Sequence, residues 1–131
     1  MFLGSCLCGA VKYTIQMEQL DDITLCHCHN CQKASGSAFN AVTPVAAENF
    51  QVEDEQGVLK HYESSPGLER HFCGQCGSPL FSFRPATLLY RVRIGSLADR
   101  ITFQPAHPIY YAYRAPWLSI NDIAPKYPEG L

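Results

Sequence analysis

The sequence predicts a mainly β fold, and two observations lead to this prediction. Several short segments alternate apolar and polar residues, as half-buried strands do, and Gly, Pro, Ser or Asp residues separate them. No segment sustains an apolar period of 3.6 residues, so long amphipathic helices are not expected. The chain has 131 residues, 47% of them hydrophobic and 17% charged, which is typical of a globular domain. We expect one domain spanning residues 1–131.

The first predicted strand covers residues 10–16, where Val11, Tyr13 and Ile15 alternate with polar residues. Further strands are predicted from short β-branched or aromatic segments at residues 37–45, 57–64, 69–73, 79–83 and 87–97. Residues 44–50 fit one helical turn. Turn residues separate these strands at hairpin-like intervals.

The alternation is clearest within residues 87–97. One face is expected to carry Leu88, Tyr90, Val92 and Ile94, and the other Leu89, Arg91 and Arg93. The last quarter of the chain is rich in proline, which predicts extended and irregular backbone. Its aromatic side chains at residues 107–120 need burial or a ligand, and burial in the core is favoured over a ligand platform.

Charge and hydropathy exclude several partners. The net charge is −2 and the Lys and Arg residues are scattered, so the basic surface that a nucleic-acid partner requires is not expected. No apolar run approaches the roughly 18 residues that cross a bilayer. The first residues lack the basic segment and long apolar core of a secretion signal. We therefore expect a cytoplasmic protein with no nucleic-acid and no membrane partner.

The seven cysteines fall in three short clusters, which are Cys6 with Cys8, then Cys26 with Cys28 and Cys31, then Cys73 with Cys76. Disulfides are rare in a reducing compartment, and an odd number of cysteines cannot pair fully. Bound metal is therefore the better explanation. Zinc is favoured, although thiolates also bind iron or an iron–sulfur cluster.

The spacing indicates how the thiolates divide between ions. A C-x-C pair on an extended segment, or a C-x-x-C pair around a tight turn, presents two sulfurs to one ion. A structural zinc normally has four Cys or His ligands, whereas a catalytic zinc keeps three protein ligands and an open position. We therefore predict a closed site from the two outer pairs and a three-ligand site from the middle cluster. The alternative gives the middle cluster His27, His29 or His71 as a fourth ligand.

Five motifs follow one another between residues 4 and 125: GSCLCGAVKY, CHCHNCQKASGSAF, RHFCGQCGSPL, IGSLAD and APWLSINDIAP. In this order the chain resembles the glutathione-dependent formaldehyde-activating enzyme family, which also includes centromere protein V. The resemblance implies stacked antiparallel sheets of the β-tent type with two zinc ions. It implies a structural zinc on Cys6, Cys8, Cys73 and Cys76, and a catalytic zinc on Cys26, Cys28 and Cys31.

The activity that names the family joins glutathione and formaldehyde, which is formally a carbon–sulfur lyase reaction run backwards. The resemblance therefore implies a zinc-dependent carbon–sulfur lyase-type enzyme that forms or cleaves a small thiol adduct, with a glutathione adduct as the candidate substrate. An open position on a three-thiolate zinc can hold a substrate sulfur as the thiolate. Candidates for the general acid or base are His27, His29 and Asp122.

Two other classes of function are compatible with these motifs. In the first, the chain is a zinc-stabilised protein-binding module without catalysis, and its aromatic C-terminal segment meets a partner. In the second, it sequesters metals or thiols. An open middle site favours the enzyme, whereas a fourth protein ligand there favours the binding module.

Overall fold

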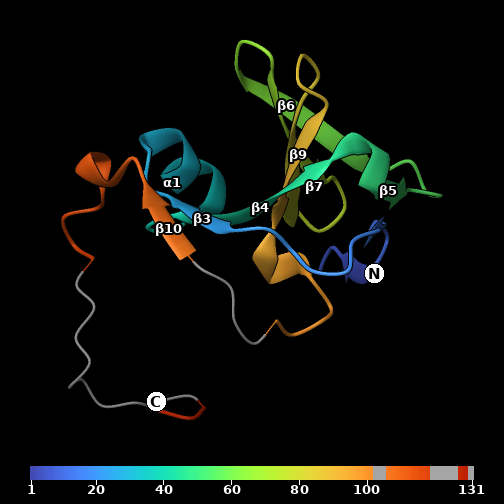
Figure 1. The fold of residues 1–131 in the computed structure, drawn as a ribbon, viewed down its shortest axis with the longest axis horizontal. Coiled ribbons are helices and arrows are strands. Elements are labelled where there is room, and N and C mark those ends of the chain that lie inside the picture. Colours follow the sequence, from blue (N-terminus) through green and yellow to red (C-terminus); the bar gives the residue numbers. More distant parts are fainter. Residues whose placement is uncertain (102–105, 119–126, 130–131) are drawn as a thin grey trace.

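The structure, a computed structural model, describes residues 1–101, 106–118 and 127–129, and its strands form two sheets (Figure 1). The smaller sheet is antiparallel in the order β1-β2-β5, with β1 at Phe2–Ser5, β2 at Lys12–Ile15 and β5 at Phe50–Glu53. The prediction of a mainly β fold with stacked sheets is confirmed.

The larger sheet has the strand order β10-β3-β4-β9-β8-β7-β6. These strands are β3 (Ile23–Cys26), β4 (Asn40–Ala46), β6 (Leu59–Ser65), β7 (Leu68–Cys73), β8 (Pro79–Arg84), β9 (Leu89–Arg93) and β10 (Ala106–Ile109). Neighbouring strands are antiparallel except β10 and β3, which are parallel. The helical elements are α1 (His29–Ser35), η1 (Ala47–Asn49), η2 (Ile94–Ser96) and η3 (Tyr111–Tyr113).

Strand β4 links the two ends of the fold (Figure 1). It follows α1 in the chain and leads through η1 directly into β5, so one segment joins the helix, the large sheet and the small sheet. The one helical turn expected at residues 44–50 is present as η1.

The large sheet presents two different faces. On one face, Phe81 and Tyr90 pack against Phe50 of the small sheet, with ring centroids 5.0 and 4.5 Å from the Phe50 ring. On the opposite face, Arg70 of β7 and Arg91 of β9 both stand opposite Ser82 of β8. Side chains alternate across a strand, so the arginines point away from the aromatic core.

The strand predicted at residues 10–16 has the expected inner face. Val11 and Ile15 are fully buried, and Tyr13 is 1% exposed. Tyr13 packs on Phe50 at 5.2 Å between ring centroids and shares a hydrogen bond of 2.6 Å with Ser96. The two sheets therefore meet along an apolar layer that the alternation in residues 10–16 had indicated.

The prediction at residues 87–97 is wrong at both ends. Leu88 is 62% exposed in a turn with a positive φ of 51°, and Ile94 begins the turn η2 rather than continuing the strand. The aromatic C-terminal segment was expected in the core, but Tyr110, Tyr111, Tyr113 and Trp117 are more than half exposed. None of the helices in the described ranges is long and apolar enough to cross a membrane.

Several elements carry too few residues for their periodicity to be read from the sequence. They are the strands β1, β3, β5 and β10 and the helix α1. Helix α1 has only seven residues, which is about two turns, so a 3.6-residue period cannot emerge. The chain turns into α1 directly after Cys28, whose own backbone is still extended.

Candidate metal centres

The four-cysteine group consists of Cys6, Cys8, Cys73 and Cys76, whose sulfurs all lie within 4.8 Å of one another. Two similar turns bring them together. Cys6 follows β1 and its carbonyl accepts a hydrogen bond from Gly9, which has φ +79°. Cys73 ends β7 and its carbonyl accepts one from Gly77, also with φ +79°. Both turns need a left-handed residue at their last position, which glycine adopts without strain.

Hydrogen-bond donors surround these sulfurs. The backbone N–H of Val11 donates to Cys6 Sγ at 3.3 Å, and that of Gln75 donates to Cys73 Sγ at 3.4 Å. The hydrogen bond from Ser78 lowers the pKa of Cys76 to about 5, from an ordinary value of 9. Donors of this kind stabilise thiolates, which are the form that binds a metal ion.

The sulfur spacing fits a tetrahedral metal site. The Sγ atoms of Cys6 and Cys8 are 3.6 Å apart, and those of Cys8 and Cys73 are 3.9 Å apart. Four sulfurs at about 2.3 Å from a central zinc ion would be separated by about 3.8 Å. All seven cysteines are free thiols. The four-cysteine group can therefore hold one ion with no ligand from outside the chain.

The three-cysteine group consists of Cys26, Cys28 and Cys31, whose sulfurs also lie within 4.8 Å of one another. Cys26 ends β3, Cys28 is the N-cap of α1, and Cys31 lies in its first turn. The N–H of Cys31 donates to Cys28 Sγ at 3.3 Å, so the cap of the helix is itself a thiol of the group. The short helix thus fixes two of the three sulfurs.

Arginine and amide groups contact this second group of thiols. Two guanidinium nitrogens of Arg70 lie 3.7 and 3.8 Å from Cys31 Sγ, and Asn40 Nδ2 lies 3.9 Å from it. Burial alone would raise the pKa of Cys31, but the hydrogen bonds from Cys26 and Arg70 lower it below 9. Burial raises the pKa of Cys26 to about 12. The contact with Arg70 therefore favours the thiolate form of Cys31.

No histidine or carboxylate joins the three-cysteine group in the described part of the chain. His27 is 3% exposed and packs between Phe39 and Tyr111, with ring centroids 5.2 and 5.3 Å away. His29 is exposed on α1, close to the Tyr113 ring at 5.7 Å. Asp122, the third candidate acid or base, lies outside the described residues.

His71 lies on the aromatic face of the large sheet. Its ring stacks on Phe81 at 4.7 Å, whereas its neighbour Arg70 reaches Cys31 on the other face. There His71 forms a group with His61 and Glu69, whose ligand atoms lie within 4.8 Å of one another and which could also hold an ion. His71 is thus directed away from the three-cysteine group.

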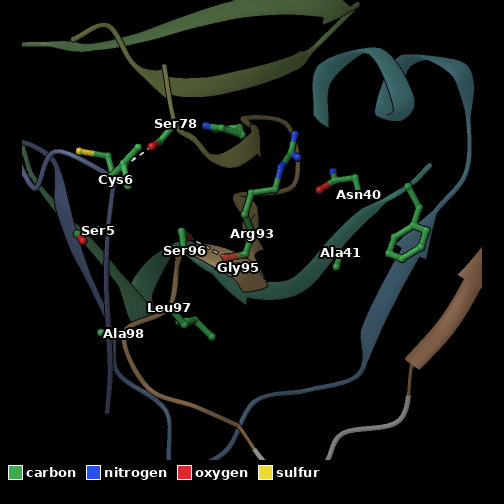
Figure 2. A pocket seen from close by; sticks show the side chains of 13 residues that line it. Ser5, Cys6, Asn40, Ala41, Ser78, Arg93, Gly95, Ser96, Leu97 and Ala98 are labelled. Carbon is green, nitrogen blue, oxygen red and sulfur yellow. Dashed lines mark hydrogen bonds between the residues drawn. The ribbon is translucent and has the colours of Figure 1, made fainter. Parts of the chain in front are cut away.

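A cavity of several hundred Å³ adjoins each cysteine group. The first, of about 420 Å³, is lined by all three cysteines of the three-cysteine group together with Arg70, Arg84 and Arg91. The second, of about 650 Å³, is lined by Cys6, Ser78 and Arg93 among others. Figure 2 shows the second cavity, in which the side chain of Arg93 extends toward Asn40. Asn40 lines both cavities.

Residues 1–113 match the sequence model of the family described as glutathione-dependent formaldehyde-activating enzyme. The chain belongs to this family. A similar protein of Halomonas elongata, provisionally named a glutathione-dependent formaldehyde-activating enzyme, is 32% identical over 87 residues, which are 63% of this chain and 55% of that protein. An uncharacterised lyase of Schizosaccharomyces pombe is 33% identical over 78 residues, which are 60% of this chain and 54% of that protein. The chain thus spans about half the length of these curated relatives.

The fold also has a match among solved structures. The crystal structure of a Rhodobacter sphaeroides protein has a TM-score of 0.64 and 20% sequence identity, and the match covers 79% of this chain and 98% of that one. At this identity, the similarity supports the fold alone. The fold of this family member is therefore shared with a protein of almost unrelated sequence.

The structure adds residues that the cysteine motifs did not indicate. Gln32 donates to the carbonyl oxygens of His27 at 2.8 Å and Tyr113 at 3.0 Å, so it ties α1 to the segment after β10. Arg70 and Asn40 contact Cys31 from distant strands. The alternation in residues 87–97 could have placed Arg91 and Arg93 on one face of a strand. The positions of Arg70 and Asn40 depend on strand pairing, which no local sequence pattern encodes.

Proposed function

We propose that the chain is a zinc-dependent carbon–sulfur lyase-type enzyme that forms or cleaves a small thiol adduct. In this proposal, Cys26, Cys28 and Cys31 hold the catalytic zinc, and the four-cysteine group holds a structural zinc. The observation that carries the proposal is the asymmetry of the donor sets. One group supplies four sulfurs, and the other supplies three that line a cavity of about 420 Å³.

Family membership supports an enzyme of this reaction class. The family description and the names of the two relatives refer to glutathione-dependent formaldehyde activation and to a lyase. A glutathione-type thiol is accordingly the candidate substrate. The seven free thiols suit a reducing compartment such as the cytoplasm, and we propose that residues 1–131 act as one domain.

The residues around the cavity suggest how such a reaction proceeds. When bound, zinc would stabilise the substrate sulfur as a thiolate, both before it attacks and after it departs. In the forming direction, the S–C bond forms as the carbonyl π bond of a small aldehyde breaks, and the thiol proton ends on the carbonyl oxygen. Arg70 and Asn40 donate hydrogen bonds to Cys31 Sγ. These hydrogen bonds draw negative charge away from the three sulfur ligands.

A different observation favours the binding module. Tyr110, Tyr111, Tyr113 and Trp117 expose more than half of their surface, and Tyr110 and Tyr113 line a small cavity together with Cys28. Exposed aromatic side chains of this density often mark a contact surface. In that case both ions would only shape the fold, and removal of the middle ion would weaken partner binding rather than turnover.

The test is an assay of zinc-loaded protein with glutathione and formaldehyde, following formation of the thiol adduct by NMR. The proposal predicts a rate above the uncatalysed reaction that disappears in Cys28→Ser protein. A matched control is His107→Ala, which removes an exposed histidine on the parallel strand β10 and should leave the rate unchanged. If purified, zinc-loaded protein never exceeds the uncatalysed rate with glutathione or with simpler thiols, the lyase proposal is wrong.

A further inference from the structure

Arginine side chains gather on one face of the large sheet. Arg70 and Arg91 stand in one row across β7, β8 and β9, because both pair with Ser82. Arg84 lies two residues along β8 from Ser82, and Arg93 lies two residues along β9 from Arg91, so both share this face. Four of the six arginines in the chain thus lie within three adjacent strands.

Within the described residues, no carboxylate lines the cavity on this face or pairs with its arginines. The lining of the 420 Å³ cavity includes Arg70, Arg84 and Arg91 but no Asp or Glu. The ion pairs within the described ranges join His71 to Glu69 and His107 to Asp22, so none of these arginines has a carboxylate partner there. Like charges this close repel one another, and burial together with the charge of Arg70 lowers the pKa of Arg93 to about 10.

The negative charge of the thiolates in the three-cysteine group offsets part of the positive charge of these arginines. Arg70 contacts Cys31, and Arg93 is close enough to Cys26 and Cys31 for their charges to interact. A zinc ion with three thiolates carries one net negative charge, which one arginine can offset. The guanidinium groups of Arg84 and Arg91 make no hydrogen bond to a sulfur or to any other side chain in the described residues, so their charges remain available.

We propose that Arg84 and Arg91, with Arg70 beside the cysteines, bind an oxyanion on the substrate of this cavity. The inference rests on the proposed function and narrows its substrate class to thiol adducts with a carboxylate or phosphate at a distance from the sulfur. Guanidinium groups match both oxyanions, because their paired N–H donors bind two oxygens at once. The volume of about 420 Å³ suits a short peptide-like thiol.

The first arm of the test compares ligands that carry ionised acidic groups with related ligands that lack them. Glutathione, whose carboxylates are ionised, is compared with its diethyl ester, and 4′-phosphopantetheine with pantetheine, by calorimetric titration of the zinc-loaded protein. The charged member of at least one pair should bind about tenfold more tightly, and this preference should shrink as salt rises. Preference in the first pair identifies a carboxylate, and preference in the second a phosphate. Equal binding within both pairs overturns the inference.

The second arm removes individual charges. Arg84→Gln and Arg91→Gln should each reduce the preference for the acidic ligand severalfold, without changing the binding of pantetheine, which carries no charge. Arg100→Gln, which removes an exposed arginine outside the cavity, is the matched control and should leave the preference unchanged. If all three variants behave alike, the positive charge acts nonspecifically and the inference is wrong.

The third arm separates this inference from the lyase proposal. S-methylglutathione keeps the carboxylates but has no free thiol, so its binding reports on the arginines alone. If it binds and depends on Arg84 and Arg91 while no turnover is found, the oxyanion site stands and the lyase proposal fails. If neutral thiols are turned over as well as charged ones, the lyase proposal stands and the oxyanion site fails.

Discussion

The two cysteine groups use the same side chain in different surroundings. The four-cysteine group joins two turns that are far apart in the chain, one after β1 and one after β7, and its sulfurs accept hydrogen bonds from Val11, Gln75 and Ser78. The three-cysteine group comes from the six consecutive residues 26–31, where β3 ends and α1 begins. Its sulfurs accept hydrogen bonds from Arg70, Asn40 and the backbone N–H of Cys31. From this difference in sequence separation, we expect a metal ion bound to the four-cysteine group to stabilise the fold more than one bound to the three-cysteine group.

This difference also affects what each group can do. A metal bound by distant segments closes a long loop, so its binding free energy enters the free energy of folding. A metal bound by one short segment adds little to the global fold, because that segment is already ordered by β3, α1 and β4. The side chains around the three-cysteine group can therefore serve a ligand in the adjoining cavity.

The largest effect is expected from Cys73→Ser, which breaks the link between the two turns. Loss of a structural zinc site costs on the order of 10 kcal/mol, more than a domain of this size can lose, so the variant should be unfolded or insoluble. Circular dichroism and metal analysis of the soluble fraction would measure this. Cooperative melting at the wild-type temperature with full metal content would show that the four-cysteine group does not stabilise the fold.

A smaller effect is expected from Cys28→Ser in the other group. Serine is a good N-cap, so α1 should keep its cap while the group loses one sulfur ligand. The zinc content should fall from about two ions to about one per chain, with the circular dichroism spectrum retained. Global unfolding of this variant would mean that the structural and functional roles of the two groups are reversed.

Gly4→Ala perturbs the small sheet next to the four-cysteine group without removing a thiol. A Cβ at Gly4 would overlap the ring of Tyr13, which is buried under β1, so the ring or the strand must shift. We expect a loss of about 1 to 3 kcal/mol in the free energy of unfolding. Metal analysis should still find both ions, and simultaneous loss of zinc would show that general damage to the fold empties the site as well.

The smallest effect concerns alkaline pH, where thiolate ligands stay deprotonated. Burial raises the pKa of Tyr13 to about 12, above the value of about 10 in the unfolded chain, although its hydrogen bond with Ser96 opposes the shift. Stability should therefore be complete below pH 10 and decline as the pH rises toward 12, by about 1 kcal/mol at pH 11. Denaturation with urea across this range should show a smaller decline in Tyr13→Phe than in the wild type, and a remainder is expected because burial also raises the pKa of Tyr90.

The sequence predicted the parts of this molecule that local patterns encode. The inner face of residues 10–16 followed from alternation, and the division of cysteines into four and three followed from their spacing. The strand β10 and the helix α1 were missed, because one is paired in parallel with a distant strand and the other is only two turns long. The gathering of Arg70, Arg84 and Arg91 on one face of the sheet could not be predicted either, since it depends on the register of β7, β8 and β9.

The contrast between a closed and an open group is tested most directly by X-ray absorption at the zinc edge during titration with glutathione. With both groups loaded, the mean number of sulfur neighbours per zinc should be about 3.5 without thiol. It should rise to about 4 at saturation, as a fourth sulfur joins the three-cysteine group, and Cys28→Ser should not show this rise. A sulfur number that stays constant at saturating thiol would contradict an open position at Cys26, Cys28 and Cys31.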